Sequence, residues 1–315
     1  MQYLTSSESL DKYIKDNINK VEIDDVFKTE EYSDFGNITY TEKTRAVIKV
    51  QDGCDRFCSY CIIPFARGKI RSRKPESVLE EIVEISKNGI KEVVITGIHV
   101  ASYGRDFENG YRLIDLLEEI NKIDGIERIR LGSIEPLLIT EEFMNRFIKL
   151  EKVCHHFHLS LQSGCTETLK RMNRHYTSGE YYELCKKLRN AFDGTTLTTD
   201  VMVGFPGETA EDFECSLSFV EKVGFEKVHV FPYSIRPGTP AAKMTDQIEK
   251  CEKEKRAAIM SSTTEKIRKD FLESQVGETL EVLIEEYKDK WSKQMYDYFK
   301  ECLSEIKKKL KALEI

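Results

Sequence analysis

Three cysteines, Cys54, Cys58 and Cys61, stand within eight residues of one another in the spacing C-x-x-x-C-x-x-C. Thiolates this close on one short loop can each bind a different iron of a single cubane cluster. A structural zinc or iron site normally has four protein ligands, whereas a reactive site leaves one position open for a small molecule. Three ligands on one loop therefore indicate a reactive iron–sulfur centre.

Two other interpretations of the three cysteines remain open on spacing alone. They could belong to a zinc site whose fourth ligand is a histidine, or they could be unliganded thiols. The candidate fourth ligands are His99, His155, His156 and His158.

Composition limits the class of protein. Apolar residues make up 40% of the 315 residues and charged residues 33%, which is enough apolar material for a core and typical of a globular domain. No run approaches the roughly 18 apolar residues of a membrane span, and residues 1–7 resemble no signal peptide. Nine cysteines, three of them clustered, favour reduced thiols and metal over disulfides. We therefore expect a cytoplasmic protein that binds no membrane.

Strand and helix patterns alternate from Arg45 onward. Apolar or β-branched runs predict six strands, at 46–50, 92–97, 128–131, 156–161, 195–203 and 228–233. Helical periodicity predicts helices from Pro75, at 113–123, 140–150, 166–172, 178–190, after the capping box Thr209/Asp212, and at 247–272.

This alternation predicts an α/β fold in which helices cover a parallel sheet. Six strand–helix units are too few for a closed eight-stranded barrel, so we expect a partial, six-unit parallel β/α barrel with short N- and C-terminal appendages. The chemistry of parallel barrels lies at the carboxyl ends of the strands. The cysteine loop follows the first strand and would lie on that rim.

A basic segment surrounds the cysteine loop. Residues 43–74 contain nine Lys and Arg against two Asp, a net charge of +7 in a chain whose net charge is −7. Arg67, Lys69, Arg71 and Arg73 alternate with other residues, so an extended segment would present them on one side. We expect these four residues to contact the phosphates of a nucleic acid.

The cysteine spacing, with the aromatic Tyr60 beside the last cysteine, resembles the radical SAM superfamily. Segments 62–73, 159–164, 172–177 and 200–208 resemble the methylthiotransferases of that superfamily. The resemblance implies a 4Fe-4S cluster held by Cys54, Cys58 and Cys61, with S-adenosyl-L-methionine on the fourth iron. The cluster would donate an electron, and cleavage of the sulfonium would give a 5′-deoxyadenosyl radical that takes hydrogen from an adenine carbon.

Two segments indicate a subfamily. Residues 96–104 and 229–241 look like the MtaB type, which converts N6-threonylcarbamoyladenosine beside the tRNA anticodon to its 2-methylthio derivative. The types that act on prenylated adenosine in tRNA or on a ribosomal protein are the neighbouring alternatives. A radical SAM enzyme with another outcome, and a non-catalytic iron–sulfur or RNA-binding remnant, are further alternatives.

The resemblance and the expected rim together suggest partners and contacts. The partners would be the unpaired bases of the tRNA anticodon loop and an electron donor such as flavodoxin or ferredoxin, and no DNA. The expected cofactor contacts are the polar or small residues at strand ends together with the aromatic residue of the loop: Tyr60, Thr96, Gly97, Ser133, Glu135, Gln162 and Asp200.

The resemblance covers the middle of the chain best. Residues 1–40 look like the remnant of an N-terminal methylthiotransferase domain, without the three further cysteines that bind a second cluster in that family. Residues 41–275 form the expected radical SAM core. Residues 276–315 would combine a truncated or divergent start of a TRAM-like domain with an amphipathic C-terminal helix. If the second-cluster domain is missing, the chain could still cleave S-adenosylmethionine but would fail to insert sulfur.

Overall fold

A computed structural model of the protein describes residues 29, 31–33 and 44–279. One four-stranded sheet has the order β2-β1-β3-β4, and one three-stranded sheet has the order β5-β6-β7. All neighbouring strands pair in parallel except β2, which pairs antiparallel with β1. The strands are β1 (Arg45–Asp52), β2 (Arg71–Ser72), β3 (Glu92–Gly97), β4 (Arg128–Leu131), β5 (His156–His158), β6 (Thr196–Val203) and β7 (Lys227–Pro232).

The two sheets continue into each other between β4 and β5. Isolated parallel bridges join Ile129 to Val153 and Ile134 to Leu159. The backbone N–H of Ile129 donates to the carbonyl of Lys152 at 2.7 Å, and that of Ile134 donates to His158 at 2.8 Å. Six parallel strands therefore follow one another in chain order. The expected partial, six-unit β/α barrel is confirmed.

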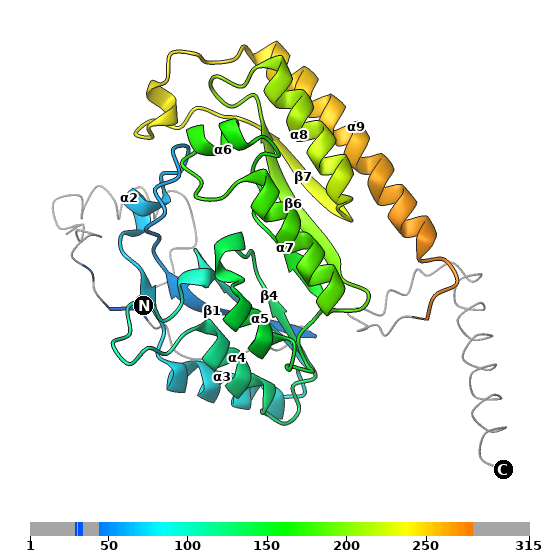
Figure 1. The fold of residues 1–315 in the computed structure, drawn as a ribbon. Helices are drawn as coiled ribbons and strands as arrows, with labels where there is room; N and C mark the ends of the chain where they lie inside the picture. The colour runs from blue at the N-terminus through cyan, green and yellow to red at the C-terminus, as the bar shows by residue number, and fades with distance from the viewer. Residues whose placement is uncertain (1–28, 30, 34–43, 280–315) are drawn as a thin grey trace, which may run out of the picture.

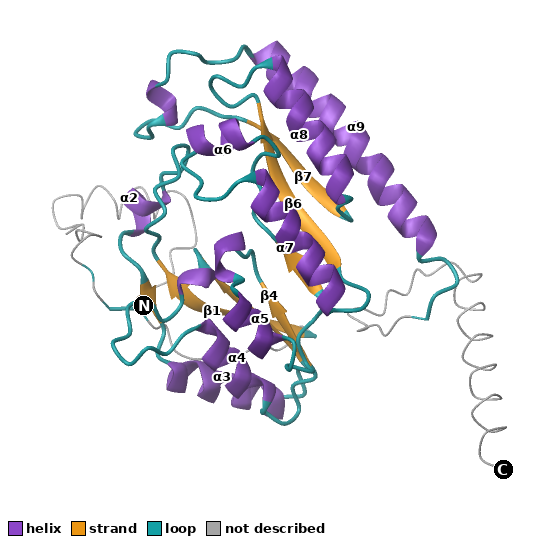
Figure 2. Cartoon of the chain, in the orientation of Figure 1, coloured by secondary structure: helices purple, strands orange, loops and turns teal. Residues whose placement is uncertain are grey.

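Helices cover one side of this sheet, which we call the outer face, and α9 runs beside β7 and α8 (Figures 1 and 2). The helices are α2 (Ile63–Arg67), α3 (Pro75–Lys87), α4 (Leu113–Asn121), α5 (Glu141–Phe147), α6 (Thr166–Arg171), α7 (Ser178–Ala191), α8 (Ala210–Val223) and α9 (Lys250–Ser274). Single 3-10 turns are η1 (Val100–Ser102), η2 (Pro136–Leu138) and η3 (Ala241–Lys243).

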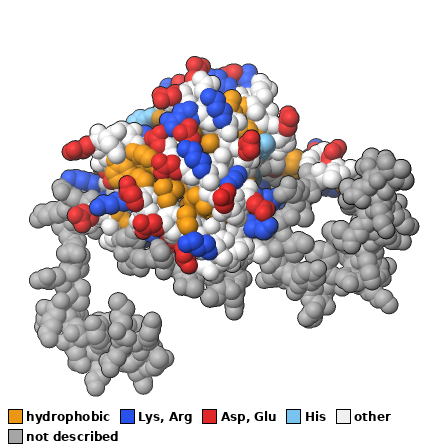
Figure 3. All heavy atoms as spheres, turned by 90° about the horizontal axis from the view of Figure 1, so that it is seen from below, with side chains coloured by type: hydrophobic (Ala, Val, Ile, Leu, Met, Phe, Trp, Pro, Cys, Tyr) orange, Lys and Arg blue, Asp and Glu red, His pale blue; other side chains and the backbone are white. Residues whose placement is uncertain are grey.

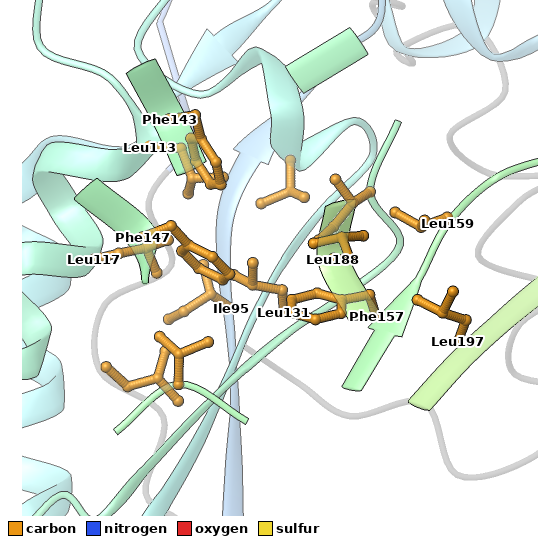
Figure 4. Packing of buried hydrophobic residues seen from close by; sticks show 14 of the residues in the cluster. Ile95, Leu113, Leu117, Leu131, Phe143, Phe147, Phe157, Leu159, Leu188 and Leu197 are labelled. Atoms are coloured by element: carbon orange, nitrogen blue, oxygen red, sulfur yellow. The ribbon is translucent and has the colours of Figure 1, made fainter. Parts of the chain in front are cut away.

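The core lies between the outer face and these helices. Successive side chains of a strand point to opposite faces, and the apolar member of each pair faces the helices. Ile95, Leu131, Phe157 and Leu197 come from four different strands, and all four are buried (Figure 4). Phe147 of α5 reaches this layer and lies 5.9 Å from the ring of Phe157. One continuous core therefore unites all six strand–helix units.

Local sequence explains where several helices begin. The hydroxyl of Thr209 accepts from the N–H of Asp212, whose carboxylate accepts in return from the N–H of Thr209, as the expected capping box requires. Thr177 and Glu180 form the same arrangement at the start of α7. Pro75 occupies the first turn of α3, where its missing N–H has no cost.

Three expectations about the elements were wrong in detail. The strand predicted at 156–161 ends at His158, because the chain beyond it makes only the isolated bridges. The helix predicted at 140–150 spans only Glu141–Phe147. Segment 63–72 forms a short helix and a short antiparallel strand, which periodicity did not predict.

The surface is highly charged. On the face shown in Figure 3, acidic and basic side chains are interspersed. None of the helices in the described part of the chain is long and apolar enough to cross a membrane. The amphipathic helix expected at 291–315, most of the expected TRAM-like strand and nearly all of the segment 1–40 lie outside the described residues.

Candidate functional site

The cysteine loop begins directly after β1, at the carboxyl end of the strand. Gly53 has φ +75°, and a Cβ at this position would lie 1.7 Å from the carbonyl oxygen of Lys69. Only glycine fits such a turn. The N–H of Cys54 then donates to the carbonyl of Gly68 at 3.1 Å, which holds the start of the loop against the chain that leaves it.

The far end of the loop is held by segments that come much later in the sequence. The N–H of Ser59 donates to the carbonyl of Met172 at 3.0 Å, and its hydroxyl donates to that of Arg171 at 2.8 Å. The carbonyl of Ser59 accepts from the N–H of Ala241 at 2.8 Å. Asn173 donates through Nδ2 to the carbonyl of Phe57 at 2.9 Å. Backbone and side-chain hydrogen bonds therefore fix the loop on both sides.

The three thiols suit an iron–sulfur cluster. Cys58 is buried, and Cys54 and Cys61 are half-buried. Burial raises the pKa of Cys54 to about 11 and also raises the pKa of Cys61. Thiolates at these positions need the positive charge of bound iron to compensate for desolvation. Three cysteines on one ordered loop, at the rim of a parallel barrel, match the donor set of a three-cysteine cubane.

A site for a single metal ion is not supported. In residues 44–279, no three side chains of His, Cys, Asp or Glu are grouped to hold one ion. Two of the four histidines considered as zinc ligands are engaged elsewhere at both ring nitrogens: His99 binds Glu135 and Ser102, while His158 contacts Thr198 and Asp200.

Arg174 connects the cysteine loop to the strand ends. This side chain is 7% exposed, and its Nη1 donates to the sulfur of Cys58 at 3.4 Å. Its Nη2 donates to the carbonyl of Ser160 at 3.2 Å, just beyond β5. Hydrogen bonds to ligating sulfurs tune the reduction potential of a cluster. Arg174 lies in the segment 172–177 that resembles the methylthiotransferases, but nothing in the sequence predicted this contact.

Glu135 is the second residue of this network. Its side chain is 4% exposed, and its Oε2 binds Arg56 at 2.8 Å and Nε2 of His99 at 2.9 Å. Burial raises the pKa of Glu135, but the hydrogen bond from His99 and the charges of Arg174, His99 and Arg56 outweigh it, so the pKa lies below its usual value. Glu135 is therefore a buried, ionised anchor for three cationic or protonatable groups.

The other predicted cofactor contacts lie at the same rim, and their role stays a prediction. Thr96 and Gly97 end β3, and the Oγ atoms of Ser133 and Ser160 are 2.8 Å apart. Gln162 has φ +71°, and its N–H donates to the carbonyl of Asp200 at 2.9 Å.

Tyr60 lies at the edge of a small apolar cluster. This cluster contains Met172, Phe205, Tyr233 and Ala241, and the ring of Tyr60 lies 6.5 Å from that of Phe205. Its predicted contact with a cofactor also stays a prediction.

A pocket of about 460 Å³ lies beside the first cysteine. Its lining combines apolar and charged side chains with loop backbone, from Cys54, Asp55, Phe57, Pro64, Gly68, Lys69, Ile70, Arg105 and Asp106. Arg105 and Asp55 form an ion pair of 3.1 Å in its wall. The cysteine loop thus has an open side next to basic residues.

The basic segment does not form one extended side, so that expectation was wrong. Arg67 ends α2, and Lys69 is exposed in the turn that follows. Arg71 is 8% exposed and donates to the carbonyls of Arg67 and Lys69. Arg73 is 5% exposed and forms an ion pair with the buried Glu81. Only Arg67 and Lys69 remain available as predicted contacts for phosphate.

Comparison with known proteins places these features in context. The sequence pattern of the radical SAM superfamily matches residues 48–220. The threonylcarbamoyladenosine tRNA methylthiotransferase MtaB of Bacillus subtilis is 39% identical over 265 residues, which cover 84% of this chain and 58% of the relative. A tRNA-2-methylthio-N(6)-dimethylallyladenosine synthase of Pelotomaculum thermopropionicum is 42% identical over 255 residues, 81% of this chain and 57% of the relative. The chain therefore spans little more than half the length of these two relatives.

A third relative is covered more fully. The MtaB protein of Aquifex aeolicus is 36% identical over 304 residues, which cover 96% of this chain and 74% of the relative. Proteins named for two different modified adenosines thus match with similar identity.

Two solved structures share the fold. The radical S-adenosylmethionine methyltransferase TsrM of Kitasatospora setae superimposes with a TM-score of 0.53 at 21% identity, over 63% of this chain and 38% of that one. Coproporphyrinogen III oxidase (HemN) of Escherichia coli gives 0.50 at 17% identity, over 71% of this chain and 54% of that one. Both likenesses concern the fold alone.

Proposed function

Because the chain belongs to the radical SAM superfamily and, within it, to the tRNA methylthiotransferases, we propose that it acts in the 2-methylthiolation of a modified adenosine beside the tRNA anticodon. The observation that carries the proposal is the ordered cysteine loop at the carboxyl end of β1. This is the edge of a parallel barrel where reactive groups converge.

Cys54, Cys58 and Cys61 would hold the 4Fe-4S cluster of the superfamily, with S-adenosylmethionine beside it. When bound, the cluster supplies the electron that cleaves the sulfonium of S-adenosylmethionine. The chain's own residues bind and orient the cofactor and the substrate, and they exclude water from the site. Arg174 holds the sulfur of Cys58, and Glu135 holds Arg174 through a 3.9 Å ion pair.

For the substrate, we propose N6-threonylcarbamoyladenosine. Segments 96–104 and 229–241 support this choice by their likeness to the MtaB type, and two relatives carry that name. Dimethylallyladenosine is the second candidate, favoured by relatives such as the Pelotomaculum protein. The tRNA anticodon loop would be the partner, with Arg67 and Lys69 at its phosphates, and a flavodoxin or ferredoxin would supply electrons.

Metal content gives the first test. After anaerobic reconstitution, we expect about four irons and four sulfides per chain, and loss of both in the Cys54→Ala/Cys58→Ala/Cys61→Ala variant. The control is Cys215→Ala/Cys251→Ala, which removes two exposed cysteines and should leave the iron content unchanged. Zinc or no iron in the wild-type chain would overturn the proposal.

Chemistry gives the second test. Under reduction, the reconstituted chain should cleave S-adenosylmethionine to 5′-deoxyadenosine, and the triple variant should not. Mass analysis of tRNA nucleosides from cells that lack their own 2-methylthio derivatives, with and without the expressed chain, identifies the substrate. A 2-methylthio derivative of dimethylallyladenosine alone would establish the second candidate. Cleavage with neither derivative formed would contradict methylthiolation by this chain and support the expectation of cleavage without sulfur insertion.

A further inference from the structure

Three polar side chains gather on the inner face of the sheet, opposite the core. His158 of β5, Asp200 of β6 and His229 of β7 form this group, which we call the inner-face triad. Their strand neighbours Phe157 and Val201 are buried in the core on the outer face. Since side chains alternate along a strand, the triad points the other way. All three members are half-buried.

The contacts of His158 set its orientation. Its Nε2 lies 3.3 Å from Oδ2 of Asp200, and its Nδ1 lies 3.0 Å from the hydroxyl of Thr198. Both ring nitrogens thus face a polar partner, the carboxylate of Asp200 on one side and the hydroxyl of Thr198 on the other. His158 therefore positions the carboxylate of Asp200 and is itself fully engaged.

The other two members have capacity left for a ligand. Asp200 and His229 are paired in the register of β6 and β7, and the ring of His229 lies 6.0 Å from that of His158. Within residues 44–279, neither the ring of His229 nor Oδ1 of Asp200 has a hydrogen-bond partner. A half-buried donor and a half-buried acceptor thus face the same space. The side chain of Asp200 is 31% exposed, so a ligand can reach its second oxygen.

The triad lies close to the cysteine loop. Arg174 bonds both to the sulfur of Cys58 and to the carbonyl of Ser160. Ser160 stands two residues beyond His158, which corresponds to about 7 Å along an extended chain. A base that reaches the reactive end of the barrel would therefore have its substituent near the triad.

The two candidate substrates differ in the group attached to N6 of adenine. The threonylcarbamoyl group offers a urea N–H, a hydroxyl and a carboxylate, whereas the dimethylallyl group is a branched hydrocarbon. An apolar group would leave Asp200 and His229 without partners, and a site built for hydrogen bonds rejects a substrate that lacks them.

We infer that the inner-face triad binds the polar N6 substituent and selects threonylcarbamoyladenosine over dimethylallyladenosine, an inference that rests on the proposed function. Oδ1 of Asp200, which the sequence predicted as a cofactor contact, instead accepts from the N–H or hydroxyl of the substituent. His229 donates to its carboxylate or hydroxyl. His158 acts on the substrate only through Asp200, so it is a positioning residue. His229 opens segment 229–241, one of the two segments on which the subfamily likeness rests.

Binding to three RNAs tests the inference. They are anticodon stem–loops of one sequence with threonylcarbamoyladenosine, dimethylallyladenosine or plain adenosine at the modified position. We expect the full chain to prefer the first over the second at least about tenfold. His229→Phe should reduce that ratio about tenfold or more, with unchanged affinity for the unmodified loop, and Asp200→Asn should reduce it less. The tenfold change in this ratio corresponds to the loss of one hydrogen bond from His229 to a charged or polar group of the substituent.

His155→Phe is the matched control. His155 precedes β5. Its Nδ1 donates to the carbonyl of Asp193, and its ring lies against that of Phe192, away from the triad. This variant should prefer the threonylcarbamoyladenosine RNA over the dimethylallyladenosine RNA by the same factor as the wild type. Thermal unfolding of each variant checks that it is folded.

The outcomes separate the inference from the proposed function. A wild-type chain that binds the modified loops equally would overturn the inference alone. So would a His229→Phe variant that keeps the ratio, or one that weakens all three RNAs alike. A chain that binds none of the RNAs would overturn the proposed function and the inference with it.

Discussion

The two faces of the same strands differ sharply. On the outer face Ile95, Phe157 and Val201 are at most 1% exposed and belong to one core. Their neighbours in sequence, Thr96, His158 and Asp200, lie half-buried on the inner face. The alternation of side chains along each strand thus separates residues that pack in the core from residues that can contact a substrate.

The largest effect should come from the outer face. Phe157→Ala removes a ring that contacts Phe147 and Phe192 in the core, so we expect a loss of about 3–5 kcal/mol in the free energy of unfolding. Denaturant unfolding followed by circular dichroism measures it. His158→Ala, the next residue on the same strand, should cost about 1 kcal/mol, because it gives up a hydrogen bond with Thr198 and a contact with Asp200 but no core contact. Equal losses would contradict this division between the two faces of the strand.

The second-largest loss of stability should come from a buried ion pair outside the six parallel strands. The guanidinium of Arg73 forms its ion pair with Glu81 where both side chains are at most 6% exposed. Arg73→Met leaves the carboxylate of Glu81 buried without its cation, at an expected cost of about 3 kcal/mol. The same unfolding measurement tests it.

The double variant Arg73→Met/Glu81→Leu is the control for that prediction. Removing both charges restores an apolar contact, so most of the lost stability should return. If the double variant is as unstable as the single one, the cost lies in packing or in other contacts of Arg73 and not in an unpaired charge.

A histidine on the inner face, His156, should make the stability of the protein depend on pH in acid. Burial, followed by the charges of Arg130 and His158, lowers the pKa of His156 to about 4 from a usual value of 6.5. Because the pKa of His156 is lower in the folded chain, the unfolded chain binds the proton more readily. The contribution of neutral His156 to the free energy of unfolding is therefore fully present above pH 6.5 and decreases as the pH falls toward 4. Between pH 7 and pH 5 we expect a loss of about 2 kcal/mol from this residue.

His156→Gln is the matched variant for the acid effect. It keeps a polar side chain near Thr198 but cannot titrate, so its stability should fall less than that of the wild type over the same pH range. Free energies of unfolding at pH 7, 6 and 5 give the comparison. Parallel curves for the two proteins would show that His156 titrates normally.

Sequence patterns predicted most of the fold because strands and helices of a parallel barrel carry local signals. The apolar run 92–97 and the alternation in 195–203 became β3 and β6 with at most one residue of error. The capping box at Thr209 placed the start of α8. Each signal lies within a few residues of the element it predicts.

The site was predictable only where its residues are adjacent in sequence. The cysteine spacing is local, but the partners of the loop lie more than 100 residues away at Arg171, Asn173 and Arg174. Arg73 was misplaced for a different reason: periodicity shows its alternation with Arg71 but not its ion pair with Glu81, eight residues on along α3.

The smallest effect should come from Lys69, the exposed basic residue beside the pocket. Lys69→Ala should change the free energy of unfolding by less than about 0.5 kcal/mol. If Lys69 contacts a phosphate, the slope of log affinity against log salt concentration for the anticodon stem–loop should fall by about 1. Lys87→Ala, an exposed lysine at the end of α3 that pairs with Glu84, should leave the slope unchanged. An unchanged slope in Lys69→Ala would remove this residue from the RNA surface and leave Arg67 as its remaining predicted contact, since Arg71 and Arg73 are committed to the fold.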